Sequence, residues 1–220
     1  MTPTAALYAL TRRTVARFLR HAWRPTVTGL GNLPDTGGAI LAANHLSVAD
    51  QLFLAALTPR HVVFWAKAEY FRRPGLSGHL TRRALTALGT IAVERDNGRA
   101  ALTALAAATP VLRAGGLVAA FPEGTRSPDG RLYRGRTGIV RLADQAGVPV
   151  IPVGIRGTDR IRPAGAHLPR RHPISITFGA PIRVHIDEPA DNRRYTDILM
   201  AAIQALTGQE YVPQHARRQA

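Results

Sequence analysis

The hydrophobic residues of this chain recur with two different periods. Short apolar runs that are rich in Val, Ile and Ala predict buried strands. Longer stretches with apolar residues three or four positions apart predict helices. The expected strands are residues 27–30, 39–43, 61–66, 89–95, 116–121, 148–155 and 174–178. The expected helices are residues 3–24, 48–57, 76–88, 98–114, 138–147 and 192–206.

The alternation of strands with helices predicts the fold class. Short buried strands separated by helices form a mostly parallel central sheet flanked by helices, so we expect an α/β single-domain sandwich. A chain of 220 residues fits one such domain. We place it at residues 25–208, between an N-terminal amphipathic helix at 1–24 and a loose basic tail at 209–220. Pro149 and Pro152 indicate that the strand 148–155 starts late or contains a bulge.

The first expected helix combines apolar, aromatic and basic residues. Its apolar positions include Leu7, Leu10 and Phe18, and Trp23 lies near its end. Its other sides carry Arg12, Arg13, Arg17 and Arg20. A helix of this kind suits a lipid interface. It equally suits a first helix packed on the domain, and the two interpretations are compatible.

Composition and charge narrow the classes of partner. The net charge is +15, and Lys67 is the only lysine, so arginine supplies nearly all of the positive charge. An arginine surplus favours phosphate groups. No helix-turn-helix and no aromatic-interleaved RNA motif is recognisable, so nucleic acid is not an expected partner. The lack of cysteine excludes a thiol nucleophile and disulfides. No run approaches 18 apolar residues, so we expect no transmembrane segment, and no signal peptide is evident.

Residues 42–50, AANHLSVAD, join the strand 39–43 to the following helix. Ser47 and Asp50 form an acidic variant of the capping box, which predicts that the helix starts here. His45 then lies at the strand-to-helix turn, and the bend at Ser47 brings Asp50 beside it. A carboxylate that orients an imidazole and stabilises its protonated form is what a general base requires. The alternative is a capped helix with a histidine in its turn.

A second polar cluster, FPEGTRS at residues 121–127, follows the strand 116–121. Here Glu, Arg and two hydroxyl groups surround Gly124, which allows backbone N–H groups to approach a ligand. Arg126 can bind an anionic oxygen through two parallel hydrogen bonds. The alternative is a β-turn with a surface Glu–Arg pair.

Charged and polar residues follow several of the expected strands. His45, Lys67 and Glu123 each follow an expected strand closely, and Arg95 lies at the exit of the strand 89–95. Ligands of parallel α/β folds gather at the carboxyl ends of strands, so we expect these four residues to share one site. Taken singly, Arg95 is explained by a solvated charge, and Lys67 by a surface pair with Glu69.

Four sequence blocks, in this order and spacing, resemble those of a known family. The blocks are NHLSVAD (44–50), GTIAVER (89–95), FPEGTRS (121–127) and VPVIPVGI (148–155). They resemble the glycerolipid acyltransferase family, specifically 1-acyl-sn-glycerol-3-phosphate (lysophosphatidic acid) acyltransferases of the bacterial type. The resemblance covers about residues 30–179. Residues 67–71 also look like the family's K-x-E-L-F segment, with Tyr70 where Leu is usual.

The resemblance implies direct acyl transfer from acyl-CoA or acyl-carrier protein to the sn-2 hydroxyl of lysophosphatidic acid, which gives phosphatidic acid. His45 is then the base that takes the hydroxyl proton, and Asp50 is its orienting partner. The substrate-binding residues that we predict, with the arginines near the acceptor phosphate, are Lys67, Arg95, Glu123, Gly124, Thr125 and Arg126. The oxyanion also needs hydrogen-bond donors, and backbone N–H groups near His45 or Gly124 are candidates. No cofactor, metal or acyl-enzyme is required.

Two features depart from the family pattern. YRGR at 133–136 stands where a Phe-Lys-x-Gly segment is usual. Since Arg keeps the charge of Lys but not its geometry, the acceptor could instead be another lysophospholipid, a lyso-aminolipid or glycerol-3-phosphate. Without a transmembrane segment, the protein is expected to reach its lipids peripherally, at the cytoplasmic face of an anionic membrane. A non-catalytic binder of anionic lipid or nucleic acid is the remaining alternative.

Overall fold

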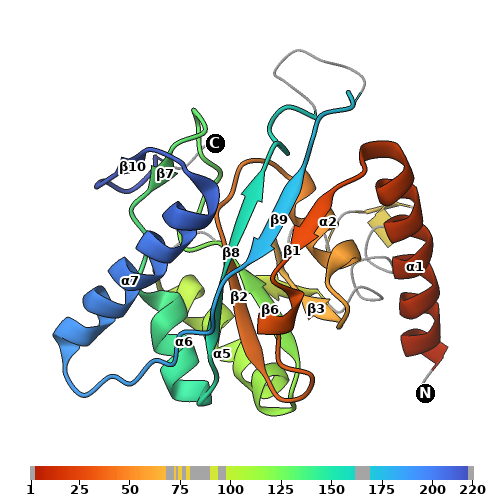
Figure 1. The fold of residues 1–220 in the computed structure, drawn as a ribbon. Helices are drawn as coiled ribbons and strands as arrows, with labels where there is room; N and C mark the ends of the chain where they lie inside the picture. The colour runs from red at the N-terminus through yellow and green to blue at the C-terminus, as the bar shows by residue number, and fades with distance from the viewer. Residues whose placement is uncertain are drawn as a thin grey trace.

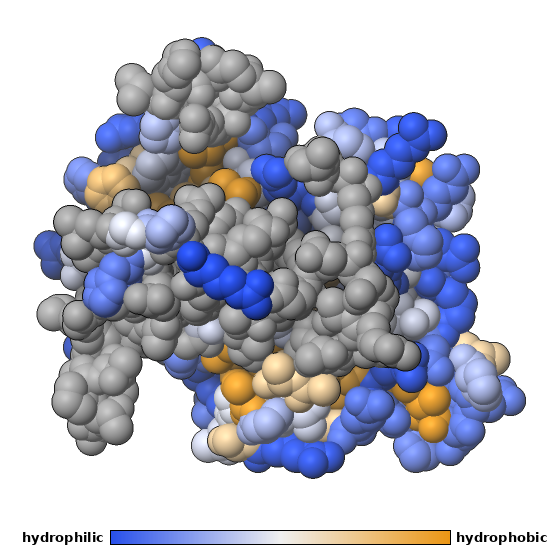
Figure 2. All heavy atoms as spheres, turned by 180° about the vertical axis from the view of Figure 1, so that it is seen from behind, coloured by the Kyte–Doolittle hydropathy of each residue, from blue (hydrophilic) through white to orange (hydrophobic). Residues whose placement is uncertain are grey.

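The computed structural model describes residues 3–67, 72, 74, 75, 78, 79, 90–93, 98–161 and 169–217. Most of the expected helix 76–88 lies outside these residues, as do Glu69 and Arg95. Among the helices of the described part, none is both long and apolar enough to cross a bilayer. On the face seen in Figure 2, the coloured atoms are mostly hydrophilic, and the apolar areas are small and separate.

A six-stranded sheet forms the centre of the described structure (Figure 1). In spatial order its strands are β1 (Thr26–Thr28), β9 (Ser175–Phe178), β8 (Val150–Arg156), β2 (Ala39–Ala43), β6 (Leu117–Ala120) and β3 (Val62–Val63). Every neighbouring pair is parallel except β8 and β9, which are antiparallel. The prediction of a mostly parallel sheet flanked by helices is therefore confirmed.

The two faces of the sheet are covered by different helices. Helices α1 (Pro3–Trp23) and α2 (Ala49–Leu57) pack on one face, and α5 (Gly98–Arg113), α6 (Gly138–Ala146) and α7 (Pro189–Thr207) pack on the other (Figure 1). Successive residues of β2 face opposite sides, so Leu41 joins the first core and Ile40 the second. Because both faces are buried, the central strands are apolar throughout rather than alternating.

Two parallel strand pairs lie outside the main sheet. β4 (Trp65–Lys67) pairs with β5 (Ile91–Val93), and β7 (Leu132–Tyr133) pairs with β10 (Tyr211–Val212). The expected single strand 61–66 is therefore two strands, of which only β3 joins the main sheet.

The expectation of a loose tail at 209–220 was wrong for its described part. β10 lies within it, the side-chain amide of Gln209 donates to the Gly130 carbonyl, and Ala216 is buried. Periodicity missed this segment because a two-residue strand is too short to show a period.

Prolines mark the start of one strand and of one helix. β8 begins at Val150, after Pro149, which confirms the late start, and it continues through Pro152. Helix α7 begins earlier than expected, with Pro189 at its first turn and a capping box between Glu188 and Asp191.

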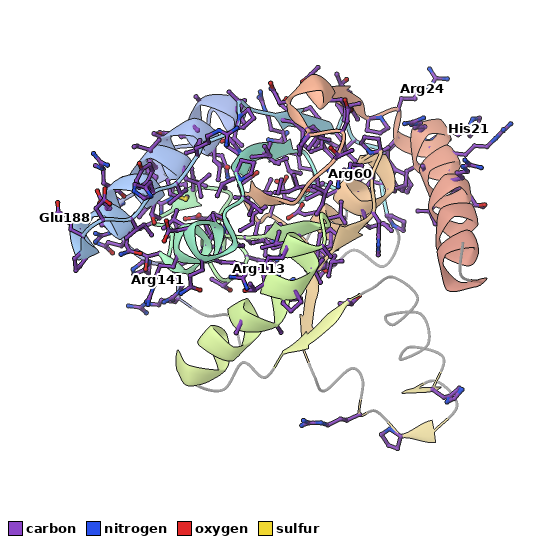
Figure 3. The ribbon with its side chains drawn as sticks, turned by 90° about the horizontal axis from the view of Figure 1, so that it is seen from below. His21, Arg24, Arg60, Arg113, Arg141 and Glu188 are labelled. Carbon is purple, nitrogen blue, oxygen red and sulfur yellow. The ribbon has the colours of Figure 1, made fainter. Side chains whose placement is uncertain are left out.

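Arg60, which follows α2, connects the loops at the amino-terminal ends of the parallel strands (Figure 3). Its guanidinium donates to the carbonyls of Pro34, Gly37 and Gly115, which precede β2 and β6. The carboxyl ends of the parallel strands meet at the opposite edge. The polar side chains of the candidate site lie there.

Candidate active site

The turn that carries His45 begins where β2 leaves the sheet. Asn44 is fully buried, and its side-chain amide donates to the Ile155 carbonyl at 2.8 Å and accepts from the Ile155 N–H at 2.8 Å. The side chain thus continues the pairing between β2 and β8 in place of a main chain. The main chain of β2 no longer pairs with β8 beyond this point, so it can turn at His45.

His45 and Asp50 meet across this turn as predicted. Nδ1 of His45 lies 2.8 Å from Oδ2 of Asp50. The same oxygen accepts the N–H of Leu46 at 2.6 Å and of Ser47 at 2.9 Å, and the carboxylate is completely buried. Because this oxygen acts as an acceptor for two amides, Nδ1 carries a proton that it donates. Nε2 is therefore the basic nitrogen of the neutral imidazole.

The capping box at Ser47 takes an altered form. Helix α2 begins at Ala49, and the Ser47 hydroxyl accepts the Ala49 N–H at 3.1 Å instead of the Asp50 N–H. Asp50 reaches back to the Ser47 N–H, as a capping-box acid does. The predicted box is thus half present, and its acid also binds the histidine.

One face of the His45 imidazole also packs against an aromatic ring. It stacks on Phe121 with ring centroids 3.9 Å apart and planes 14° apart. Phe121 directly follows β6, the neighbour of β2, so the parallel pairing brings the two rings together. The His45 side chain remains 13% exposed, so a reactant can reach it.

The segment 121–127 is joined to His45 through the main chain. The His45 N–H donates to Oε1 of Glu123 at 3.0 Å, and the Ser127 N–H donates to the His45 carbonyl at 2.7 Å. The Ser127 hydroxyl in turn donates to the Arg131 carbonyl at 2.7 Å. The two polar segments that the sequence singled out are therefore joined by hydrogen bonds.

Within the segment 121–127, the side chain of Glu123 points inward and has no exposed surface. Its second oxygen accepts the Tyr133 N–H at 3.0 Å, so both oxygens are occupied by backbone donors. Burial raises the pKa of Glu123 to about 7, although both backbone N–H groups favour its charged form. We predicted that Glu123 contacts the acceptor, but in this structure it supports the histidine turn. The sequence could not reveal this, because burial depends on the packing of distant segments.

Three residues in the middle of this segment are accessible. Gly124 and Arg126 are exposed and Thr125 is half-buried. Gly124 has φ +76°, and a Cβ there would lie 2.9 Å from Nε of Arg136, so the Arg136 side chain lies directly beside the glycine. Sequence reasoning gave Arg136 no binding role, although the YRGR segment was the available signal.

Several expected contributors lie beyond what the structure describes. The backbone of Lys67 belongs to β4, whose partner is β5, but its side chain and the whole of Arg95 fall outside the described residues. Their presence in the site stays a prediction. In the described part, no cluster of three or more acids and histidines is arranged to hold a metal ion.

A depression of about 470 Å³ lies elsewhere, between α6 and the start of α7. Its lining includes Arg141 and Glu188, which are labelled in Figure 3, together with Asp144 and Asn192. Its lining includes no histidine and no residue of the four sequence blocks described above. A histidine that could act as a general base is therefore found at the His45 turn and not in this depression.

Known proteins share this arrangement of segments. The Acyltransferase family model matches residues 24–156. A 1-acyl-sn-glycerol-3-phosphate acyltransferase of Limnanthes alba is 36% identical over 145 residues, which are 66% of this chain and 50% of that protein. One from Pseudomonas aeruginosa is 34% identical over 131 residues, 59% of this chain and 48% of that protein. The chain spans about half the length of the curated relatives it matches.

A solved structure agrees with the sequence comparisons. The crystal structure of the 1-acyl-sn-glycerophosphate acyltransferase PlsC from Thermotoga maritima matches 94% of this chain and 83% of its own. Its TM-score is 0.69, at 25% sequence identity. The chain belongs to the Acyltransferase family.

Proposed function

We propose that this protein transfers a fatty acyl group from a thioester to the sn-2 hydroxyl of lysophosphatidic acid, which gives phosphatidic acid. The observation that carries the proposal is the His45–Asp50 pair, with its Nδ1–H donated to a buried carboxylate and its ring partly exposed. The relatives' names, 1-acyl-sn-glycerol-3-phosphate acyltransferase, support the same acceptor.

The proposed reaction has two steps. Nε2 of His45 takes the proton of the acceptor hydroxyl while the hydroxyl oxygen attacks the carbonyl carbon of the thioester. The tetrahedral intermediate then collapses, the C–S bond breaks, and the departing thiolate takes the proton from the imidazolium. Asp50 stabilises the imidazolium between these steps, and a positioned base of this kind contributes a factor of about 10² to 10⁴. No group on the protein becomes acylated.

The acceptor phosphate is assigned to arginines beside the Gly124 turn. Arg126 is exposed and has no side-chain partner among the described residues, and Arg136 is exposed against Gly124. Arginine can bind phosphate oxygens through two parallel hydrogen bonds. Arg134, in the same segment, stands where the family's lysine is usual, so it is the residue to examine for acceptor choice.

Four of the backbone N–H groups near His45 and Gly124 are already occupied. The N–H groups of His45, Leu46 and Ser47 bind the carboxylates of Glu123 and Asp50. The Gly124 N–H donates to the Phe121 carbonyl at 3.0 Å. The exposed arginines beside Gly124 carry a charge that suits oxyanion stabilisation.

We propose peripheral contact with the cytoplasmic face of an anionic membrane through α1. Ala16 and Leu19 are buried against the core, so α1 packs on the domain. Its outer side presents Arg17, Arg20 and the 61% exposed Phe18. Both interpretations of this helix are thus compatible with its packing. Basic residues near an anionic surface contribute about 1 kcal/mol each.

Vesicle sedimentation tests the membrane contact without removing core residues. Arg17→Gln and Arg20→Gln should each weaken binding to anionic vesicles. Arg141→Gln is the control, because this exposed arginine lies on α6, which packs on the opposite face of the sheet from α1 (Figure 3). Equal binding by all three variants would contradict the assignment to α1.

Thiol release tests the acyltransferase function. Acyl-CoA and acyl-carrier protein are each supplied with lysophosphatidic acid, and the lipid product is identified by mass spectrometry. Turnover by the wild type that His45→Ala abolishes would support the proposal, whereas equal rates would refute the mechanism. A panel that adds glycerol-3-phosphate, other lysophospholipids and a lyso-aminolipid decides between acceptors, and binding of anionic lipid without turnover would indicate a non-catalytic protein.

A further inference from the structure

Thr158 contacts the catalytic pair from outside every block that the sequence singled out. It lies two residues beyond the end of β8 and is 1% exposed. Its hydroxyl donates to Oδ1 of Asp50 at 2.5 Å, across 108 positions of the sequence. The side chain of Asp50 is also fully buried, so water does not compete for this hydrogen bond.

The chain is built to bring Thr158 to this place. Gly157 has φ +85°, and a Cβ there would lie 2.1 Å from the Pro173 carbonyl oxygen, so a larger residue does not fit. This glycine turns the chain directly after β8. On the same strand, Ile155 binds the side chain of Asn44. The end of β8 therefore holds the histidine turn at two points, before and after His45.

The hydrogen bonds of Asp50 divide unequally between its two oxygens. Oδ2 accepts from Nδ1 of His45 and from the N–H groups of Leu46 and Ser47. Within the described residues, the hydroxyl of Thr158 is the partner that the structure records for Oδ1. Without it, one oxygen of a buried carboxylate would lack a donor, and such groups are strongly disfavoured.

We propose that Thr158 is a positioning residue of the active site, the third member of a Thr158–Asp50–His45 chain of hydrogen bonds. This inference rests on the proposed acyl transfer. By holding Oδ1, the hydroxyl fixes the rotation of the carboxylate so that Oδ2 faces Nδ1 of His45. By donating to Oδ1, the hydroxyl also stabilises the negative charge of Asp50, and that charge stabilises the imidazolium.

A purely structural contribution would give different consequences. If the hydrogen bond only fastened β8 to α2, its loss would lower the free energy of unfolding and leave the histidine unaffected in the folded molecules. If Thr158 positions Asp50, its loss changes the His45–Asp50 hydrogen bond while the fold persists. The environment of the Nδ1 proton distinguishes the two cases.

Three variants make the test. Thr158→Val removes the hydroxyl and keeps the shape, and Thr158→Ser restores the hydroxyl. Thr196→Val is the matched control, because Thr196 is equally buried and donates to a helix carbonyl, that of Asn192 at 2.6 Å, in α7. All three are compared with the wild type by denaturant unfolding and by proton NMR of the His45 Nδ1 proton, identified by its loss in His45→Gln.

The expected result separates the variants by chemistry as well as by stability. Thr158→Val should shift the Nδ1 proton resonance and lower kcat about tenfold or more with KM little changed, the effect of a lost hydrogen bond to a charged group. Thr158→Ser should restore both, and Thr196→Val should change neither. An unshifted resonance in folded Thr158→Val would overturn the proposal. If the wild type turned over no acceptor, the acyltransferase assignment would fall, and the resonance would still decide for or against Thr158.

Discussion

Glu123 makes the stability of this protein depend on pH in an unusual direction. The carboxyl group is completely buried, and its only recorded partners among the described residues are the N–H groups of His45 and Tyr133. Burial raises its pKa from the ordinary value of 4.5 to about 7. The folded protein therefore binds this proton more tightly than the unfolded chain does.

The size and sign of the effect follow from proton linkage. Because the folded state holds the extra proton between pH 4.5 and about 7, its contribution is complete below pH 4.5 and is lost as the pH rises through 7. The full contribution is about 3 kcal/mol, at about 1.4 kcal/mol for each pKa unit. Between pH 5 and pH 8.5 the loss amounts to about 2.5 kcal/mol.

Glu123→Gln tests this reasoning, since glutamine is neutral at every pH and keeps a similar shape. Urea unfolding of the wild type and the variant is measured from pH 5 to pH 8.5. The wild-type free energy of unfolding minus that of the variant should fall by about 2.5 kcal/mol over this range. Glu210→Gln, at a side chain that is 72% exposed, controls for the loss of one carboxylate. A difference that stays constant or rises with pH would refute the argument.

Three further changes give separate tests. Asp50→Asn keeps the shape but removes the charge that stabilises the imidazolium, so kcat in the thiol-release assay should fall by about 10² to 10⁴ with an unchanged circular dichroism spectrum; a loss below threefold would contradict the assigned role. Gly157→Ala should cost about 1–3 kcal/mol in urea unfolding, because a Cβ cannot fit beside Pro173 at φ +85°, and a stability equal to wild type would show that the turn can adapt. Deletion of residues 209–220 removes the carbonyl partners of the Leu132 and Arg134 amides, so these amides should lose protection in hydrogen exchange; unchanged protection would mean that β10 does not hold this loop.

Much of the fold was readable from periodicity alone. The central strands are buried on both faces, so they form continuous apolar runs that are easily recognised. Short strands such as β7 and β10 were missed or misjudged. Two residues carry no period, and their pairing depends on segments about 80 positions apart.

The His45–Asp50 pair was readable for a different reason. His45 and Asp50 are five residues apart and belong to one local turn, so capping chemistry predicted their contact. Glu123 was read as a binding residue because the sequence shows a polar side chain in a glycine turn. Its burial comes from the packing of the His45 and Tyr133 segments over it, which no local pattern records.

By itself, then, the sequence determined the α/β class, the strand-to-helix turn at His45 and the local His45–Asp50 pair, because each depends on residues close together in the chain. Tertiary structure alone decided that Glu123 supports the turn, that Arg136 lies beside Gly124 and that Thr158 donates to Asp50. These contacts join separate strand ends at one edge of a parallel sheet. Their partners are brought together by the pairing of β2 with β6 and β8, a register that is set by the whole core.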